Sequence, residues 1–148
     1  QAGNAAVAPG CLPANATKQG TVVEIVDGVT VKVLIDGLVY TVRYIGLALP
    51  QDNNFASAAE ANNGKMVFRK EITLIADTPD KDALGRLLRY VLVDDKMVNL
   101  ELIQQGLALA VPSTPALTCA SLFLDAQESA KAAQIGIWKI TPATARPN

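Results

Sequence analysis

The sequence predicts an α+β fold, in which a curled antiparallel barrel of five strands packs with about three helices. Two runs rich in β-branched and aromatic residues, 22–35 and 38–45, flank the dipeptide Asp36-Gly37. A DG pair between such runs is typical of a tight hairpin, because the turn needs positive φ angles that Gly adopts freely and Asp tolerates. Strand patterns and helical patterns do not alternate regularly, so a parallel βαβ arrangement is not expected.

Length and composition suit a single domain with its own core. The chain has 148 residues, half of them hydrophobic, and a formal net charge of -1. It contains no run of about 18 apolar residues, so we expect no membrane span. The charge is a poor match for a polyanionic ligand, although a local basic patch is compatible with it. The sequence has no histidine, which excludes Ser-His-Asp and Cys-His nucleophile systems and histidine-ligated zinc.

Residues 1–19 are expected to form an extended arm or tether. Residues 1–18 are small and polar and contain Pro and Gly, which is typical of the mature start of an exported protein after removal of a signal peptide. Cys11 and Cys119 belong to no CxxC pair, so zinc or thioredoxin-like chemistry is not expected. They are either inert thiols or a disulfide. In an oxidising compartment we expect the bridge, which would pin the arm to the last helix.

The first half of the chain supplies three strands and a helix. A second DG pair, Asp27-Gly28, indicates a turn or bulge between the first two strands. Pro50 ends the ladder of the third strand, and an alanine-rich segment then favours a helix. The expected bounds are 21–27, 29–36 and 38–46 for the strands and 57–69 for the helix.

The second half supplies two more strands and two more helices. EITLI alternates like a half-buried strand, and RLLRYVLV is a second strand pattern after a polar loop. The next helix is expected to begin with Asn99 as its N-cap and to end before Gly106, a suitable C′ residue. The expected bounds are 71–75 and 86–93 for the strands, 76–85 for the loop, 98–105 and 117–134 for the helices, and 107–111 for an extended segment.

A helix between the third and fourth strands of a five-stranded barrel is the OB-fold arrangement. We therefore place one domain at 20–140, after the arm at 1–19. The composition of the tail, 141–148, is typical of disorder.

Several segments of the sequence resemble the staphylococcal nuclease-like (thermonuclease) family. Their order and spacing match the family over about residues 20–138, and they are VVEIVDGVTVKV, VRYIGLALPQ, GRLLRYVLVDDKMVN, LIQQGLA and AQESAKAAQIGIW. The resemblance implies an OB-fold barrel packed on helices. It also implies kinship with calcium-dependent phosphodiesterases, because the active members of the family cleave DNA and RNA.

The active members carry the motifs DGDT and R-x-x-x-x-D-T-P-E, and this chain keeps only part of each. Val29 occupies the position of one calcium-ligating aspartate, and Ala48 occupies that of the other. Leu49 replaces the threonine whose carbonyl helps to bind the metal. Arg43 is kept, and Gln51 stands at the position of the proposed general base.

A third family motif, Y-G-R, is also incomplete. Arg86 is kept, but Leu84 replaces the tyrosine that contacts phosphate. Calcium requires several oxygen ligands, which Val and Ala side chains lack, and Gln cannot accept a proton at neutral pH. The resemblance therefore implies a nuclease fold without a metal cofactor and without activity. The expected function is that of a secreted binding or protein-interaction module.

Two other functions remain open. Arg43 and Arg86 could clamp a phosphate as bidentate donors and make the domain a weak binder of phosphate or nucleic acid. In the alternative interpretation, these arginines are solvated or held by a carboxylate such as Asp80 or Asp82. A residual calcium-dependent phosphodiesterase would need other carboxylates, for which the candidates are Asp27, Asp52 and Asp82. The run Asp77, Asp80 and Asp82 is either a solvated loop or a displaced cation site.

Apolar residues at former polar positions predict an exposed hydrophobic patch. It would consist of Leu47 and Leu84 together with the residues at the calcium positions, Val29, Ala48 and Leu49. Such patches mark contact surfaces, which favours an unidentified protein partner over nucleic acid. We expect a monomer and, from the composition of the first residues, an extracellular, cell-surface or periplasmic location.

Overall fold

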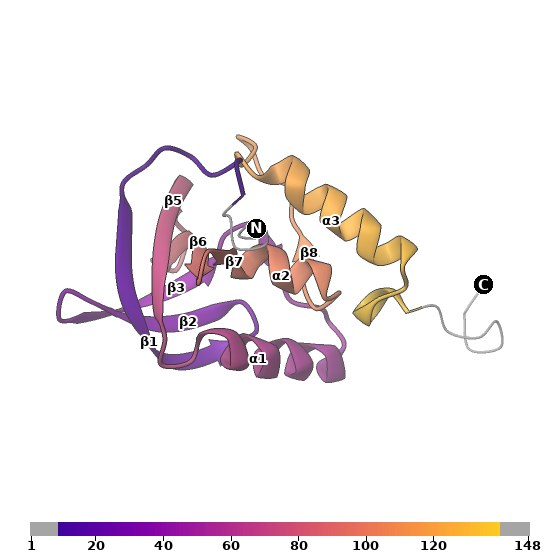
Figure 1. Ribbon diagram of the computed structural model, residues 1–148, viewed down its shortest axis with the longest axis horizontal. Helices are drawn as coiled ribbons and strands as arrows, with labels where there is room; N and C mark the ends of the chain where they lie inside the picture. The colour runs from indigo at the N-terminus through magenta and orange to yellow at the C-terminus, as the bar shows by residue number, and fades with distance from the viewer. Residues whose placement is uncertain (1–8, 140–148) are drawn as a thin grey trace.

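The computed structural model describes residues 9–139, and its centre is a closed β-barrel. The expected arm residues 1–8 and the expected tail lie outside the described residues. The barrel strands, seen at the left of Figure 1, are β1 (Thr17–Asp27), β2 (Thr30–Ile35), β3 (Leu38–Tyr44), β5 (Glu71–Lys81) and β6 (Leu87–Val93). The predicted α+β barrel of five strands is thus confirmed.

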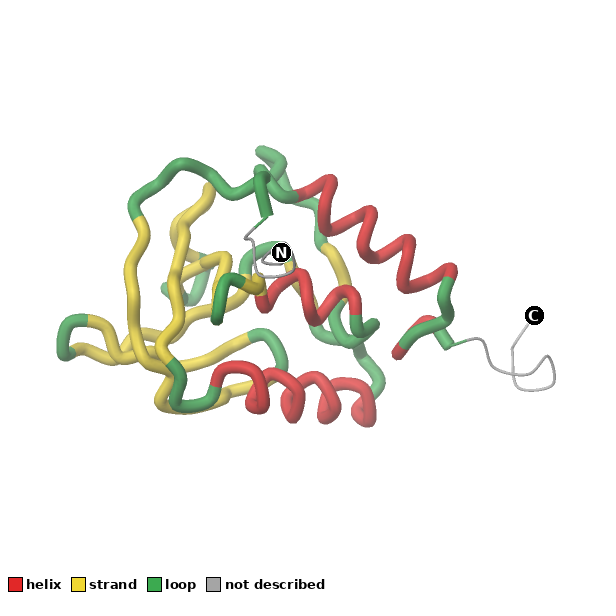
Figure 2. Tube along the Cα trace, in the orientation of Figure 1, coloured by secondary structure: helices red, strands yellow, loops and turns green. Residues whose placement is uncertain are grey.

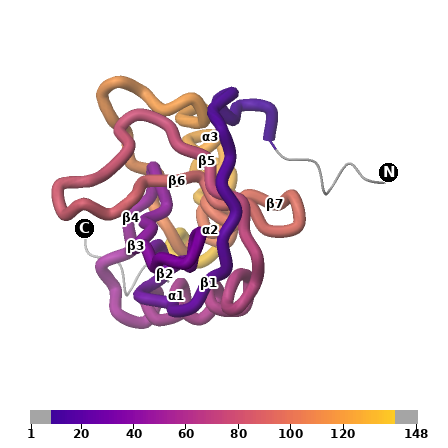
Figure 3. The backbone as a smooth tube through the Cα atoms, turned by 90° about the vertical axis from the view of Figure 1, so that its left-hand side faces the viewer, coloured from indigo at the N-terminus to yellow at the C-terminus, as the bar shows by residue number. Residues whose placement is uncertain are grey.

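The strands follow the order β3-β2-β1-β5-β6, and β3 then pairs with β6 to close the ring. All of these pairings are antiparallel except β3–β6, which is parallel and joins Val42 to Leu87 and Arg43 to Leu88. Figure 3 views this end of the molecule and shows the strands around their common interior. The β2–β3 hairpin turns at Asp36 and Gly37, whose φ angles of 50° and 84° confirm the predicted tight turn.

Three α-helices of the described chain lie beside the barrel, coloured red in Figure 2. They are α1 (Asn53–Val67), α2 (Val98–Gln104) and α3 (Ala120–Ala132). The remaining short elements are β4 (Leu47–Ala48), β7 (Lys96–Met97), β8 (Leu109–Ala110) and the 3₁₀ turn η2 (Gly136–Trp138). Within residues 9–139, no helix is both long and apolar enough to cross a membrane.

The starts of β1 and α1 differ from the prediction, because both elements begin four residues earlier than expected. β1 begins at Thr17 and not at residue 21, so the last residues of the expected arm pair with β5 from Thr17 to Thr21. α1 begins at Asn53 and not at residue 57. Its N-cap is Asp52, whose carboxylate accepts hydrogen bonds from the backbone N–H groups of Asn54 and Phe55.

Three further predictions about the second half are corrected. β5 continues to Lys81, through most of the loop expected at 76–85, and α3 begins at Ala120 and not at 117. Asn99 is not an N-cap, because α2 begins after Met97. The Asn99 side chain instead accepts from Val91 N–H and donates to Ile45 O, at 2.9 and 3.0 Å, and so ties α2 to the barrel. The predicted C′ role of Gly106 is confirmed by its φ of +69°.

Candidate functional site

The first family motif lies in the turn between β1 and β2, where its side chains have structural roles. The Asp27 carboxylate accepts the Val29 N–H at 2.8 Å, which closes an Asx turn. Val29 and Thr30 are both completely buried. The Thr30 hydroxyl has no hydrogen-bond partner within the part of the chain that the structure describes.

The second motif leaves the barrel at the end of β3. Arg43 is half-buried in β3, Ala48 is half-buried in β4, and Leu49 follows it. Gln51 is exposed just before α1. These residues therefore belong to the end of β3, to β4 and to the segment that leads into α1.

These residues do not fit a calcium ion. Calcium takes several oxygen ligands, and carboxylates supply most of its affinity in proteins. Val29 places a hydrocarbon side chain in the core, at 0% exposure, and Ala48 and Leu49 add no side-chain oxygen. Among residues 9–139, no three His, Cys, Asp or Glu side chains are grouped so that they could hold a metal ion.

The carboxylates that could replace the lost ligands are each engaged elsewhere. Asp27 closes its own turn and Asp52 caps α1. Asp82 accepts from the backbone N–H groups of Leu84 and Arg86, both at 2.9 Å. Burial raises the pKa of the Asp82 carboxyl, but these N–H groups and the Arg86 guanidinium together lower it by more. The pKa therefore lies below its ordinary value.

The two retained arginines do not act as a pair. Arg86 Nε lies 2.6 Å from the Asp82 carboxylate, which is the local ion pair that the sequence left open as an alternative. Arg89, which the sequence interpretation did not single out, pairs with Asp80 at 2.9 Å. Arg43 has no carboxylate within 4.0 Å among the described residues. Its one hydrogen bond there, at 3.2 Å, runs from Nη2 to Leu47 O.

A groove of about 340 Å³ opens beside the guanidinium of Arg43. It contains several apolar side chains and the polar side chain of Ser113, but Arg86 is not among its walls. We call it the Arg43 groove and define it by its lining residues, which are Arg43, Tyr44, Ile45, Gly46, Leu47, Ala48, Pro79, Leu88, Val111, Ser113 and Leu117. A larger groove of about 590 Å³ lies between β1 and α1, but its charged lining residues are Glu24 and Glu60 and it includes no motif position.

The exposed hydrophobic patch predicted from the sequence does not form as described. Val29 and Leu47 are buried, with exposures of 0% and 4%, because both belong to the barrel core. Leu84 is 77% exposed in the turn before β6 and is not part of the Arg43 groove. The apolar surface at this site is therefore a concave groove whose walls include residues that the prediction did not name, such as Leu88 and Leu117.

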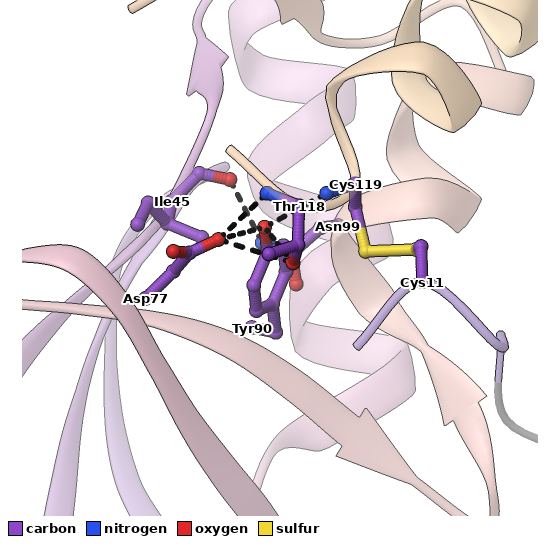
Figure 4. The surroundings of a disulfide bond; sticks show 7 residues. All are labelled: Cys11, Ile45, Asp77, Tyr90, Asn99, Thr118 and Cys119. Carbon is purple, nitrogen blue, oxygen red and sulfur yellow. Dashed lines mark hydrogen bonds between the residues drawn. A yellow bond between two sulfur atoms is a disulfide. The ribbon is translucent and has the colours of Figure 1, made fainter. Parts of the chain in front are cut away.

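A polar cluster beside the disulfide holds two walls of the groove. The predicted Cys11–Cys119 bridge is confirmed, and Figure 4 shows Asp77, Tyr90 and Thr118 converging next to it. Asp77 Oδ2 accepts from Tyr90 Oη at 2.7 Å and from the Thr118 backbone N–H at 2.9 Å. Tyr90 Oη in turn accepts the Cys119 N–H at 3.2 Å. We call these five residues the Asp77 anchor.

The electrostatics of the Asp77 anchor follow from its geometry. Burial raises the pKa of the Asp77 carboxyl, but hydrogen bonds from Thr118, Tyr90 and Thr78 outweigh that effect, so the pKa is lowered overall. Burial is also the main cause that raises the pKa of the Tyr90 phenol to about 12. The anchor therefore holds a carboxylate and a neutral phenol at neutral pH, and all of their hydrogen-bonding groups serve structure.

The Asp77 anchor matters to the site because of its position in the chain. Pro79 follows Asp77 by two residues and Leu117 directly precedes Thr118, and both line the Arg43 groove. No local sequence pattern indicates this contact, since Asp77 and Thr118 are 41 residues apart. The solvated-loop interpretation is wrong for Asp77 because its carboxylate is bonded to Tyr90 and Thr118.

Comparisons with known proteins agree with the geometry of the barrel. The family model described as "Staphylococcal nuclease homologue" matches residues 41–140. The SPbeta prophage-derived endonuclease YokF of Bacillus subtilis (strain 168) is 34% identical over 122 residues, which covers 76% of this chain and 41% of YokF. The thermonuclease of Staphylococcus intermedius is 31% identical over 122 residues, covering 78% of this chain and 73% of that protein.

A third relative has the same relation to the chain. Endonuclease YncB of Bacillus subtilis (strain 168) is 32% identical over 122 residues, covering 76% of this chain and 58% of YncB. This chain therefore spans less than two thirds of YokF and of YncB. The family match over most of the chain, the relatives and the closed barrel agree, and the chain belongs to the staphylococcal nuclease homologue family.

Proposed function

We propose that this domain is a catalytically inactive member of its family that works as a binding module. One observation carries the proposal: Val29, at the position of a calcium-ligating aspartate, is a fully buried core side chain. A metal ligand at this position would have to be rebuilt against the barrel interior. Ala48 and the amide of Gln51 support the same conclusion, since they supply neither a carboxylate ligand nor a base.

The names of the relatives, endonuclease and thermonuclease, describe what those proteins do. Metal and base act as a unit in a hydrolytic site, and removal of both leaves little turnover. The family frame is retained here while the groups that the chemistry needs are replaced. The retained feature with binding potential is the Arg43 groove, which combines apolar walls with a guanidinium.

We extend the proposal to an exported location. The Cys11–Cys119 bridge supports it, because disulfides persist in oxidising compartments and are rare in the cytosol.

Two measurements test the loss of activity. Calcium at millimolar concentration should leave the melting temperature unchanged, because residues 9–139 contain no group of carboxylates that could hold a metal ion. Purified protein should also leave labelled single-stranded DNA intact in calcium, beside a calcium-dependent nuclease as the positive control. A saturable rise of the melting temperature with calcium, or calcium-dependent cleavage that co-purifies with the protein, would refute the proposal.

A second candidate function is weak binding of phosphate or nucleic acid. The observation that favours it is the Arg43 guanidinium without a carboxylate partner among residues 9–139. Against it, Asp82 already neutralises Arg86, so the groove offers one cation and not two. An oligonucleotide bound through phosphate should lose affinity steeply as salt rises. Arg86→Gln should weaken that binding only if Arg86 leaves Asp82 to contact the phosphate. The variant therefore distinguishes binding by Arg43 alone from binding by Arg43 and Arg86 together.

A further inference from the structure

We propose that the Arg43 groove binds the C-terminal carboxylate of a partner polypeptide whose last residues are apolar. This inference rests on the proposed function, since it names the ligand class of the same groove. The partner is identified only by its chemistry. It has a free C-terminal carboxylate, and the residues that precede this carboxylate in its chain have small or medium apolar side chains.

The charge of the groove selects a monoanion. Arginine has five N–H donors, and Arg43 uses Nη2 on Leu47 O at 3.2 Å. No carboxylate of the described chain lies within 4.0 Å of it, whereas Arg86 and Arg89 each have one. A half-buried guanidinium with unused donors is a good site for one carboxylate, which accepts two parallel hydrogen bonds from the planar fork.

The walls of the groove select an apolar neighbour for that carboxylate. Leu47 and Leu117 are buried side chains that form part of the wall, and Leu88 and Val111 add further hydrocarbon. The volume of about 340 Å³ lies within the range of small-ligand pockets, which bury a ligand mostly against apolar groups. A polyphosphate chain would gain little from these walls.

Two features favour a peptide over a simple fatty acid. A second apolar cavity of about 170 Å³ shares Gly46, Val111 and Leu117 with the groove and continues to Phe123. Adjoining cavities with a common wall suit two side chains that branch from one backbone. In addition, β4 and β8 form a two-stranded sheet, and neither has a second strand neighbour among the described residues, although Ala110 N–H already donates to Gln127 Oε1 and Leu47 O already accepts from Arg43. The edges of such a sheet offer main-chain hydrogen bonds to an extended peptide but none to an alkyl chain.

The test compares two peptides that differ at a single group. Acetyl-Ala-Leu-Val with a free carboxylate and the same peptide with a C-terminal carboxamide are titrated into ¹⁵N-labelled full-length protein and followed by NMR. We expect the acid to bind at least about tenfold more tightly than the amide, because charge-assisted hydrogen bonds are roughly twice as strong as neutral ones. The largest shifts should fall on the backbone N–H groups of Leu47, Ala48, Val111 and Ser113.

Variants connect the preference to Arg43. Arg43→Gln should abolish the difference between acid and amide, while Arg69→Gln, a charge-matched change outside the groove, should leave it intact. The ¹⁵N spectrum of each variant reports whether it is folded, and Arg43→Lys provides a second variant that keeps the charge but loses the bidentate fork.

Several results would overturn the inference. They are no binding of the acid at millimolar concentration, equal binding of acid and amide, an unchanged preference in Arg43→Gln, or Arg43-dependent binding of octanoate without binding of the peptide. None of these results touches the proposed loss of catalysis, which stands or falls with the calcium and cleavage assays. Conversely, calcium-dependent cleavage would refute the proposed function even if the peptide bound.

Discussion

The Asp77 anchor and the Arg43 groove share two segments of chain, yet they differ in whether their polar groups have partners. In the anchor, a carboxylate, a phenol and two backbone N–H groups satisfy one another next to a disulfide. In the groove and the adjoining motif, the side chains that a metal site would need are replaced by Val29, Ala48 and Leu49, and Arg43 has no ionic partner in residues 9–139.

The difference separates what holds the fold from what would perform chemistry. A polar cluster in a partly buried position is stabilising only when all of its members are satisfied. The Asp77 anchor meets that condition, and it positions Pro79 and Leu117 for the groove. Of the positions that the family resemblance assigns to calcium ligands, Val29 belongs to the core and Ala48 to the groove wall. The proposed loss of the reaction would therefore leave the supports of the groove intact.

The largest expected effect comes from reducing the disulfide of the Asp77 anchor. The bridge joins residues 108 positions apart, and closing a loop of that length stabilises a fold by about 4–5 kcal/mol in the chain-entropy model. Reduction with dithiothreitol should lower the free energy of unfolding by an amount approaching this value, measured by urea titration. The double variant Cys11→Ala/Cys119→Ala should show no response to the reductant. A loss under about 1 kcal/mol in the wild type would mean that the anchor does not depend on the bridge.

The next effect tests whether the former metal position belongs to the core. Val29→Asp should destabilise the domain by about 3 kcal/mol at neutral pH, because it places an unpaired carboxylate at a fully buried position. Burial would raise the pKa of the new carboxyl, so the loss should grow as pH rises above about 4, where an unfolded aspartate ionises. Thermal melts across pH measure it. Ala48→Asp, at a half-buried position, is the matched control and should cost less.

A particular result would break the comparison here. If the double variant Val29→Asp/Ala48→Asp were folded and calcium raised its melting temperature, the motif positions would form a metal site that lacks only two side chains. The proposed absence of activity would then depend on those two substitutions.

The sequence predicted the frame of the molecule better than its contacts. Local patterns located the Asp36-Gly37 hairpin with its β2–β3 pairing and the Gly106 helix end, since each depends on residues close in sequence. The disulfide was expected from two cysteines alone. The misplaced start of α1 came from the assignment of Asp52 to a loop, although an Asp before an alanine-rich run is an ordinary N-cap.

The site was harder because its contacts are distant in sequence. Asn99 looked like a helix cap, but the structure uses its amide to join α2 to the barrel at Val91 and Ile45. Val29 was expected in an exposed patch because it stands at a calcium position of the family, but its side chain is part of the barrel core. The ion pair of Arg86 with Asp82 was one of two open alternatives, the other being a phosphate clamp. The sequence did not decide between them, although Arg86 and Asp82 lie in one polar segment.

A smaller effect is expected from the carboxylate of the Asp77 anchor. Asp77→Asn keeps the shape but removes the charge that accepts from Tyr90 and Thr118, and should cost about 1–3 kcal/mol at neutral pH. The pKa of Asp77 is lowered in the folded protein, so its contribution is fully present above its unfolded value and is lost as pH falls through the folded one. The variant should therefore show a flatter loss of stability in acid, seen by urea titration at several pH values.

The matched control is Asp80→Asn, which breaks an ion pair whose carboxylate is 61% exposed. Exposed pairs contribute about 0–1 kcal/mol, so this change should be nearly silent. Equal effects of the two substitutions would contradict the distinction between the Asp77 anchor and the solvated part of the same segment.

The smallest effect, and the only one of opposite sign, concerns Thr30 in the incomplete first motif. Its hydroxyl is fully buried without a partner in the described chain, whereas the polar groups of the Asp77 anchor are satisfied. Thr30→Val replaces the hydroxyl by a methyl group of similar size and should raise the free energy of unfolding by about 1 kcal/mol, because an unsatisfied buried donor is costly. Thr30→Ser keeps the hydroxyl and loses the methyl group, so it should destabilise. If Thr30→Val destabilised the domain instead, the Thr30 hydroxyl would have a hydrogen-bond partner in solution. The polar groups of the first motif would then be satisfied, as those of the Asp77 anchor are.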